Sequence, residues 1–268
     1  MIELDRNAIL KEMGVTQWVL RDAGGDEVSV QDTTGVSAPG EGIQSARPER
    51  GEVANVKRPP PVVEQPIQAE PEREPAIPHE EVPVALNLEA LCDQVAQCRA
   101  CELANSRTHT VFGEGPGQAD WLFVGEAPGQ QEDRQGKPFV GRAGGLLTQM
   151  IRALGQSREQ VYIANTLKCL PPNNRDPLPA ELKACEPYLL KQIQFLQPKV
   201  IVALGRISAQ ALLGSDQPLG RLRGQVYQYG PDKTPLIVTY HPAYLLRQPA
   251  DKGKVWADLL LANRQFPV

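Results

Sequence analysis

The chain of 268 residues contains no apolar run that approaches the roughly 20 residues needed for a membrane helix. It begins Met-Ile-Glu-Leu-Asp-Arg, without the basic stretch and the apolar segment that mark a secretory signal. These two absences predict a protein that is neither inserted in a membrane nor exported. We therefore expect it in the cytoplasm.

Aromatic side chains are absent from residue 19 to residue 111, and eight prolines occur between residues 59 and 83. A segment of this composition buries too little apolar surface to offset the entropy lost on ordering. We therefore expect a disordered, Pro/Glu-rich linker with polyproline II character over residues 23–85. It would separate a short apolar segment, residues 1–22, from a folded domain over residues 86–268.

Excess positive charge is also absent from the chain as a whole, whose formal net charge is −4. The acidic excess lies in the first part, where residues 1–85 hold 8 basic and 16 acidic side chains. The remaining residues hold 20 basic and 16 acidic side chains. A modestly basic domain behind an acidic tail is compatible with phosphate contact by the domain alone, although ordinary charge scatter would give the same balance.

Short apolar runs alternate with stretches of helical periodicity in the predicted domain. The expected strands are 121–124, 161–164, 199–204 and 236–239, and the expected helices are 88–98, 143–154, 180–196, 207–213 and 255–263. Apolar runs without alternation are typical of strands buried on both faces of a parallel sheet. The pattern predicts an α/β domain of three layers, with a short, mainly parallel, four-stranded sheet flanked by helices. The site is expected beyond the carboxyl ends of the strands.

The chain has only five cysteines, and an odd number without a secretory signal argues against a disulfide framework. Cys98 and Cys101 form a CxxC pair, while Cys169 and Cys185 lie sixteen positions apart. Four thiolates of this kind can hold either a zinc ion or an iron–sulfur cluster. The CxxC does not follow a strand in a βαβ unit, so a thioredoxin-like redox pair is not expected. Cys92 is interpreted as a spare cysteine on the same helix.

Polar residues follow three of the predicted strands. The segment GEAPGQQED begins at Gly125 and lacks the GK[ST] of a phosphate-binding loop, so its carboxylates could supply a base or simply face solvent. The amide of Asn165 could read a base edge or stabilise a turn. His241 could be catalytic or structural. Leu245 and Leu246 could enter a base stack as a wedge or belong to a helix core.

Four segments in this order closely resemble the motifs of the family 4 uracil-DNA glycosylases: GEAPGxxEDxxGxPFVGRAG, YIANTLKCLPPNNRDP, LGRxSAQALL and HPAYLLR. The resemblance covers about residues 88–264. It implies a uracil-DNA glycosylase-like fold and the hydrolytic excision of uracil in base excision repair. It also implies a structural 4Fe–4S cluster on Cys98, Cys101, Cys169 and Cys185. Residues 170–176 lack the basic, His-containing loop of the related branch that traps DNA covalently, so trapping is not expected.

The resemblance further implies a role for individual side chains. Phe139 would stack on the uracil ring, and Asn165 would hydrogen-bond its pairing edge and reject cytosine. Glu126 would orient or activate the attacking water, and His241 would donate to uracil O2 as negative charge develops there. The other uracil-binding positions are Gly125, Ala127, Pro128 and Glu132.

The substrate implied is uracil-containing DNA, single- or double-stranded, from which the target nucleotide must be flipped. The DNA contacts are assigned to basic and apolar residues of the motifs: Arg142, Lys168, Arg175, Leu245, Leu246 and Arg247. We expect a monomer in the cytoplasm of a bacterium, associated with the nucleoid.

A second resemblance concerns the N-terminal segment. The stretch KEMGVTQWVLR, residues 11–21, resembles the beginning of the psi subunit of bacterial DNA polymerase III, whose N-terminal segment docks on the clamp loader. It implies that Val15, Trp18 and Leu20 bind the clamp loader as a partner. Two hypotheses follow: a repair glycosylase tethered to the replisome, or a psi-type clamp-loader subunit whose glycosylase-like domain is mainly a scaffold. Intact pocket motifs favour the first, and the Trp18 segment keeps the second open.

Overall fold

The computed structural model describes residues 85–266. The predicted partner-binding segment with Val15, Trp18 and Leu20 and the predicted linker up to residue 84 lie outside these residues. Ala85, which we placed at the end of the linker, is buried against the domain, so the domain includes it. Within residues 85–266, no helix is both long enough and apolar enough to cross a membrane.

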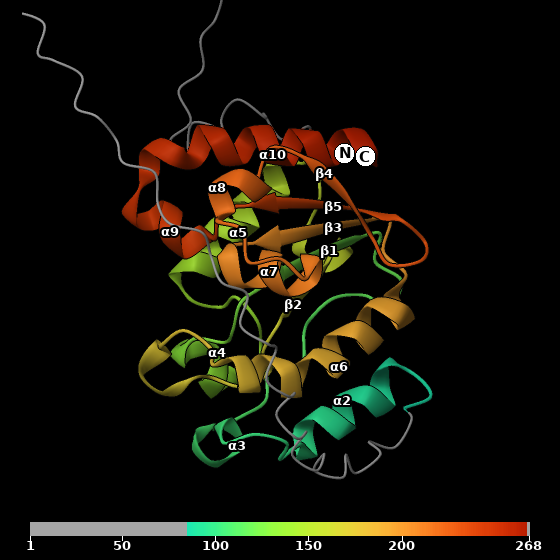
Figure 1. Cartoon of the computed structure of the whole chain (residues 1–268), viewed down its shortest axis with the longest axis vertical. Helices are drawn as coiled ribbons and strands as arrows, with labels where there is room; N and C mark the ends of the chain where they lie inside the picture. Colours follow the sequence, from blue (N-terminus) through green and yellow to red (C-terminus); the bar gives the residue numbers. More distant parts are fainter. Residues whose placement is uncertain (1–84, 267–268) are drawn as a thin grey trace, which may run out of the picture. The chain divides into compact units, whose positions relative to one another are not determined.

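One sheet with the strand order β2-β1-β3-β5-β4 forms the centre of the domain (Figure 1). The strands are β1 (Trp121–Gly125), β2 (Tyr162–Asn165), β3 (Val200–Leu204), β4 (Val226–Tyr229) and β5 (Thr234–Thr239). The first four in spatial order are parallel, whereas β4 runs antiparallel to β5. The mainly parallel sheet is thus confirmed, but the number of four strands is wrong. β4 was not predicted, because it is a partly exposed edge strand without an apolar run.

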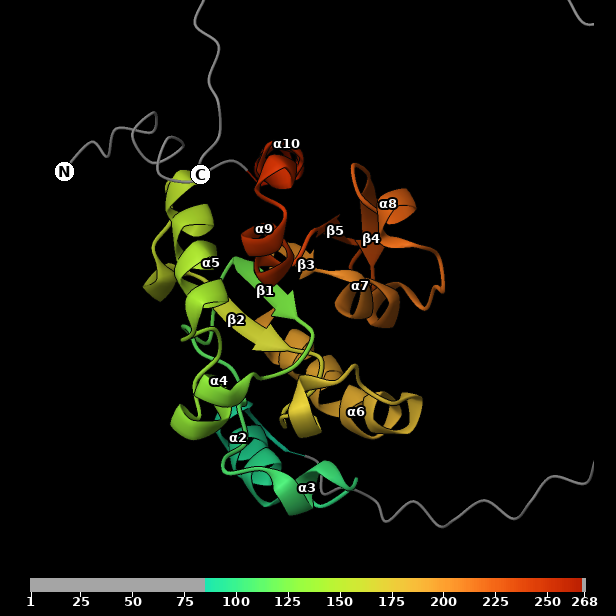
Figure 2. The same ribbon diagram turned by 90° about the vertical axis from the view of Figure 1, so that its left-hand side faces the viewer.

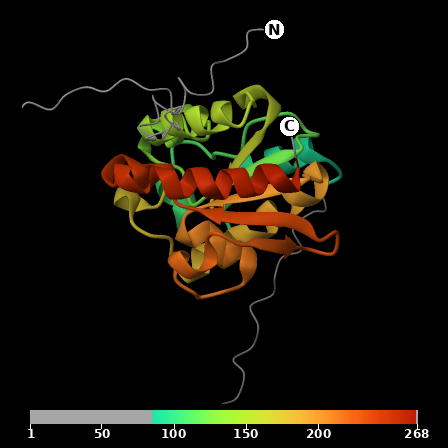
Figure 3. The same ribbon diagram turned by 90° about the horizontal axis from the view of Figure 1, so that it is seen from above.

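Helices cover both faces of the sheet (Figure 2). On one face lie α5 (Arg142–Ala153), α9 (Pro242–Arg247) and α10 (Lys252–Gln265), and on the other lie α6 (Pro179–Leu196), α7 (Arg206–Leu213) and α8 (Leu219–Leu222). α10 lies next to β5, as seen from above in Figure 3. Successive strand residues point to opposite faces, so that Phe123 joins the first core and Leu122 the second. The predicted three-layer architecture is confirmed.

A third apolar cluster lies beyond the sheet, where α2 packs against α6 (Figure 1). The remaining described elements are α2 (Leu88–Gln97), α3 (Leu103–Ser106), α4 (Gln130–Gln135) and the short 3₁₀ helices η1 (Arg158–Gln160), η2 (Pro172–Asn174) and η3 (Pro249–Asp251). The side chain of Asn87 accepts a hydrogen bond from the Ala90 N–H at 2.8 Å and starts α2. The helix ends at Cys98, so the CxxC pair begins where helical geometry stops.

Candidate active site

A cleft of about 420 Å³ opens at the carboxyl ends of β1, β2 and β5. Its size is within the range of roughly 300–1,000 Å³ that is typical of small-ligand sites. It is lined by residues from every predicted motif except LGRxSAQALL: Glu126, Ala127, Pro128, Gly129, Glu132, Phe139, Ala143, Asn165, Pro171, Asn174, Arg175, Asp176, His241, Ala243, Tyr244 and Arg247. The parallel sheet therefore brings together side chains that are more than a hundred positions apart.

Asn165 is the last residue of β2 and is 1% exposed. Its side-chain oxygen is buried and has no hydrogen-bond partner. On the neighbouring strand end, a Cβ added to Gly125 would lie 2.4 Å from this oxygen and 2.6 Å from Cζ of Phe139. Only glycine therefore lets the amide and the aromatic ring come so close. A buried amide oxygen without a partner, next to a ring, is suited to receive a planar polar ligand.

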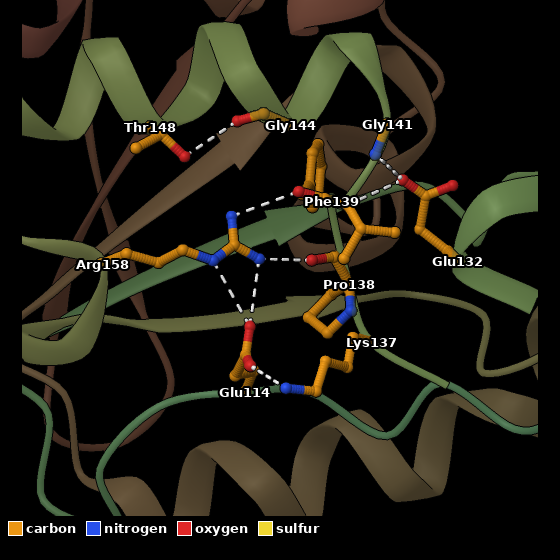
Figure 4. A network of polar contacts seen from close by, with 10 residues as sticks. Glu114, Glu132, Lys137, Pro138, Phe139, Gly141, Gly144, Thr148 and Arg158 are labelled. Atoms are coloured by element: carbon orange, nitrogen blue, oxygen red, sulfur yellow. Dashed lines mark hydrogen bonds and ion pairs between the residues drawn. The ribbon is translucent and has the colours of Figure 1, made fainter. Parts of the chain in front are cut away.

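The ring of Phe139 lies 5.5 Å from the ring of His241, centroid to centroid. The chain on its C-terminal side is fixed by Glu132, whose Oε1 accepts hydrogen bonds from the N–H groups of Val140 and Gly141 at 3.0 Å each (Figure 4). These bonds satisfy backbone donors at the start of α5. Glu132 thus borders the cleft mainly as an anchor of the segment that carries Phe139.

His241 is the N-cap of α9, and its Nδ1 accepts a hydrogen bond from the Ala243 N–H at 3.1 Å. An accepting Nδ1 places the proton of a neutral imidazole on Nε2. Burial, assisted by the positive charge of Arg247, lowers the pKa of His241 to about 4. The side chain is therefore a neutral Nε2–H donor at physiological pH.

Glu126 directly follows β1, and its backbone carbonyl accepts a hydrogen bond from the Leu167 N–H at 3.0 Å. Burial raises the pKa of the Glu126 carboxyl; the negative charge of Asp176 acts in the same direction, and the positive charge of Arg206 opposes it. A carboxylate with a raised pKa is a stronger proton acceptor. This group has the properties required of a base that activates water.

The basic residues assigned to DNA contact differ in their surroundings. Arg247 lines the cleft and is exposed, whereas Arg142 is exposed at the start of α5 and does not line it. Arg175 also lines the cleft, but its guanidinium forms an ion pair with Glu181, with Nη2 and Oε1 at 2.6 Å. Arg175 and Arg247 are thus both exposed and beside the cleft, but the guanidinium of Arg175 is engaged by Glu181.

Two of the predicted DNA contacts are wrong. Lys168 is 1% exposed, and its Nζ donates to the Asn165 carbonyl at 2.7 Å and to Gln192 Oε1 at 2.5 Å. Leu245 is fully buried in the core between the sheet and α10. Leu246, by contrast, is 38% exposed, because adjacent helical residues point in directions about 100° apart. The wedge hypothesis therefore rests on Leu246 alone.

Several residues that line the cleft had not been assigned a role: Gly129, Ala143, Pro171, Asn174, Asp176, Ala243 and Tyr244. Asn174 and its neighbour Asn173 have φ values of 52° and 56°. Asparagine tolerates this left-handed region better than most residues, so the NN pair could have indicated a sharp turn toward the site. Tyr244 stacks on Tyr240 with ring centroids 4.8 Å apart, a packing role that no local motif predicts.

The four cysteines assigned to the metal site line a second pocket, next to the cleft: Cys98, Cys101, Cys169 and Cys185. Cys92 does not line it, as expected for a spare cysteine. Burial raises the pKa of the Cys101 and Cys169 thiols and raises that of Cys185 to about 12. The uncomplexed thiols of Cys101, Cys169 and Cys185 therefore stay protonated at neutral pH.

Nitrogen donors point at three of these sulfur atoms. Arg107 Nη1 donates to Cys169 Sγ at 3.2 Å, and the N–H groups of Lys168 and Ala100 approach the sulfur atoms of Cys185 and Cys98 at 3.3 and 3.5 Å. Such bonds stabilise thiolates and tune a bound metal centre. Within residues 85–266, no three Cys, His, Asp or Glu side chains are arranged to coordinate one metal ion.

Comparison with known proteins places these features in a family. Residues 112–260 match the model of the Uracil DNA glycosylase superfamily. A type-4 uracil-DNA glycosylase of Archaeoglobus fulgidus is 44% identical over 179 residues, which cover 64% of this chain and 89% of the relative. The type-4 enzyme of Sulfurisphaera tokodaii is 47% identical over 170 residues, 61% of this chain and 77% of the relative. The type-4 enzyme of Thermotoga maritima is 46% identical over 161 residues, which cover 60% of this chain and 83% of the relative.

These matches confirm the family that the sequence motifs indicated. The family model spans more than half of the chain, and the alignments span most of each relative. The order of the motifs, the topology of the sheet, the residues that line the cleft and the alignments with relatives all indicate the same family. The chain belongs to the uracil-DNA glycosylase superfamily and, within it, to the type-4 uracil-DNA glycosylases.

Proposed function

We propose that this chain hydrolyses the N-glycosidic bond of deoxyuridine in DNA and releases free uracil. The observation that carries the proposal is the buried side-chain oxygen of Asn165, which has no partner and lies beside Phe139 in the cleft. A planar base with an N–H group would satisfy this oxygen while its face meets the ring. The type-4 relatives, each named as a uracil-DNA glycosylase, support the same conclusion.

Base recognition follows from the hydrogen-bonding pattern of an amide. After the nucleotide flips into the cleft, uracil N3–H would donate to Asn165 Oδ1, and the amide N–H₂ would donate to uracil O4. Cytosine presents an acceptor at N3 and a donor at N4, which would leave both amide groups mismatched. Leaving buried polar groups unpaired costs about 1–3 kcal/mol each, so cytosine is disfavoured.

The chemical step requires a base on one side of the sugar and a donor on the other. Glu126 would accept a proton from water as the water oxygen forms its bond to C1′. The bond from C1′ to N1 of uracil breaks, and its electron pair passes to the base, with much of the charge on O2. His241 Nε2–H would donate a hydrogen bond to O2, and a neutral donor does so without protonating the leaving group.

We also propose that the four cysteines hold a 4Fe–4S cluster. The support is the donor set, four cysteines that share one pocket, together with the resemblance to the family 4 glycosylases, which implies a cluster on these four residues. When bound, the cluster would supply a structural tie and no redox step. It would join the end of α2 to the segment 165–169 and to α6, and thereby fix the backbone beside Asn165.

The replacement Asn165→Asp tests base recognition. The carboxylate cannot donate to uracil O4, so we expect uracil excision under single-turnover conditions to fall by about 5- to 150-fold, corresponding to about 1–3 kcal/mol. Asn87→Asp is a matched control, because Asp is also a good N-cap and α2 lies outside the cleft. An Asn165→Asp enzyme as fast as wild type would show that the amide does not read the base.

For the segment 1–22, which lies outside the described residues, we propose binding to the clamp loader through Val15, Trp18 and Leu20. The support is the resemblance to psi and the enrichment of tryptophan at binding hot spots. Full-length chain should capture clamp-loader subunits in a pull-down, and a chain that starts at Leu86 should not. Equal capture by both would refute the proposal, and excision of free oligonucleotides by both would argue against a mere scaffold.

A further inference from the structure

Phe139 adopts a backbone conformation that is unusual for a phenylalanine. Its φ is +53°, in the left-handed region where a side chain other than that of glycine costs about 1–3 kcal/mol. Its carbonyl also lies so close to α5 that a Cβ on Gly144 would be 1.7 Å from the oxygen. Such a conformation persists only when surrounding groups determine it.

Arg158, the first residue of η1, provides that restraint. Its guanidinium donates to the carbonyl oxygens of both Pro138 and Phe139, the second at 3.2 Å (Figure 4). The planar fork thus fixes two successive peptide groups. A lysine could not do so in the same way, because its ammonium is a single point of charge.

Glu114 in turn orients the guanidinium. Its Oε2 accepts from Arg158 Nε at 3.3 Å and from Nη2 at 3.1 Å, and its Oε1 lies 3.4 Å from Lys137 Nζ (Figure 4). The backbone of Glu114 exchanges two hydrogen bonds with Ile163 of β2, at 2.9 and 2.8 Å. β2 ends at Asn165, so the strand that presents the amide also supports the anchor of Phe139.

We infer that Arg158 and Glu114 are positioning residues for uracil recognition: they hold the Phe139 ring at a fixed height beside the Asn165 amide. Neither residue lines the cleft, so they act through Phe139 and not on the base. The inference rests on the proposed function and extends it. In the free enzyme the ring is thereby already placed to stack when the base arrives, which lowers the cost of ordering it on binding.

Single-turnover excision by Arg158→Met should be about 10- to 100-fold slower than by wild type, because misplacement of a contact residue by about 1 Å has effects of this size. Arg158→Lys should be intermediate, and Glu114→Gln should show a smaller loss than Arg158→Met. Arg152→Met is the matched control, since Arg152 is exposed on α5, and its rate should equal that of wild type. Thermal unfolding of each variant establishes that the protein is folded.

A double-mutant cycle with Phe139→Ala separates positioning from general stabilisation. Without the ring there is nothing left to position, so Arg158→Met should cost less than about twofold in the Phe139→Ala background. An equal loss in both backgrounds, or no loss from Arg158→Met in wild type, would overturn the inference while uracil excision by wild type still stood. Absence of excision by wild type would overturn the proposed function, and this inference with it.

Discussion

The cleft and the cysteine pocket share one segment of chain, residues 165–169, but they are built in different ways. Asn165 at one end of the segment faces the cleft with an unpartnered oxygen. Cys169 at the other end lines the second pocket, and its sulfur accepts a hydrogen bond from Arg107. Lys168 between them is buried and donates hydrogen bonds to two oxygens. The cleft thus keeps polar groups available for a ligand, whereas the cysteine pocket directs its donors to its own sulfur atoms.

The contrast indicates a division of labour. A residue that must bind a transient ligand has to remain unsatisfied in the free protein, and this costs stability. A permanent centre such as a cluster can stabilise the chain that surrounds it. We therefore attribute chemistry to the cleft and the maintenance of its geometry to the cysteine pocket. Substitutions in the cysteine pocket should affect both regions, whereas substitutions in the cleft should leave the cysteine pocket intact.

The largest effect is expected from Cys169→Ala. Loss of this ligand should remove the visible absorption and most of the roughly four irons per chain, lower the unfolding temperature, and reduce excision by about 100-fold or more. Iron analysis, absorption spectra and single-turnover rates measure these three effects. Cys92→Ala is the matched control and should leave all of them unchanged, since Cys92 does not line the pocket. A colourless, zinc-loaded and fully active Cys169→Ala protein would show that the cysteine pocket does not maintain the geometry of the cleft.

The next largest effect is expected from His241→Ala, which changes the cleft and leaves the cysteine pocket intact. Removal of one preorganised donor to a developing anion costs about 10²–10³ in rate. Single-turnover excision should fall by that factor, while DNA affinity and the iron content stay those of wild type. His109→Ala is a suitable control, because His109 is exposed and bonds the Asp133 carbonyl outside the cleft. A variant with normal rate and weakened DNA binding would assign His241 to binding instead of chemistry.

A smaller effect is expected from Leu246→Ala, at the exposed leucine that precedes the cleft-lining Arg247. Opening a base step costs a few kcal/mol, so loss of a wedge should slow excision from duplex DNA more than from single strands. We expect about a tenfold loss on duplex and little change on single strands. Leu190→Ala is matched in exposure, at 41% against 38% for Leu246, and lies on α6. Equal losses on both substrates would argue against a wedge.

The smallest effect expected is that of pH on the His241 donor. Burial lowers the pKa of His241 to about 4, so this side chain stays neutral as pH falls and gains its proton only near that value. The pKa of Glu126 is raised, so its protonation also slows excision on the acid side. In Glu126→Gln, which lacks that carboxyl, the residual rate should be constant between about pH 8 and about pH 5.5. A decline centred near pH 6.5 would indicate an ordinary histidine that is charged in the lower half of this range.

Much of the fold was predictable, because each parallel strand is a short apolar run and the longer covering helices α5, α6, α7 and α10 coincide with stretches of helical periodicity, whereas the short α8 and α9 were not predicted. The sites were also suggested by local sequence, since Asn165, His241 and the segment that begins at Gly125 lie at or just beyond the carboxyl ends of strands. β4 was not predictable in the same way, because an exposed edge strand has no apolar run. The roles implied for the cleft residues and the cluster remain predictions.

The errors at Lys168 and Leu245 arise from tertiary contacts that no local pattern reveals. A lysine is almost never fully buried, and Lys168 is buried because the Asn165 carbonyl and the side-chain oxygen of Gln192, 24 positions away, both accept hydrogen bonds from its ammonium. Which of two successive leucines faces the core depends on how α9 lies on α5 and α10. The pairing of Glu114 with Arg158, 44 positions apart, is equally invisible in the sequence.

Release of free uracil is the measurement that tests the central claim most directly. Full-length protein, purified anaerobically so that the proposed cluster is retained, would be incubated in excess with single-stranded oligonucleotides that differ at one base: uracil, cytosine or thymine. The account predicts that free uracil and an abasic strand appear from the first oligonucleotide and that the other two stay intact. An iron-loaded, folded protein that leaves the uracil oligonucleotide intact would contradict it.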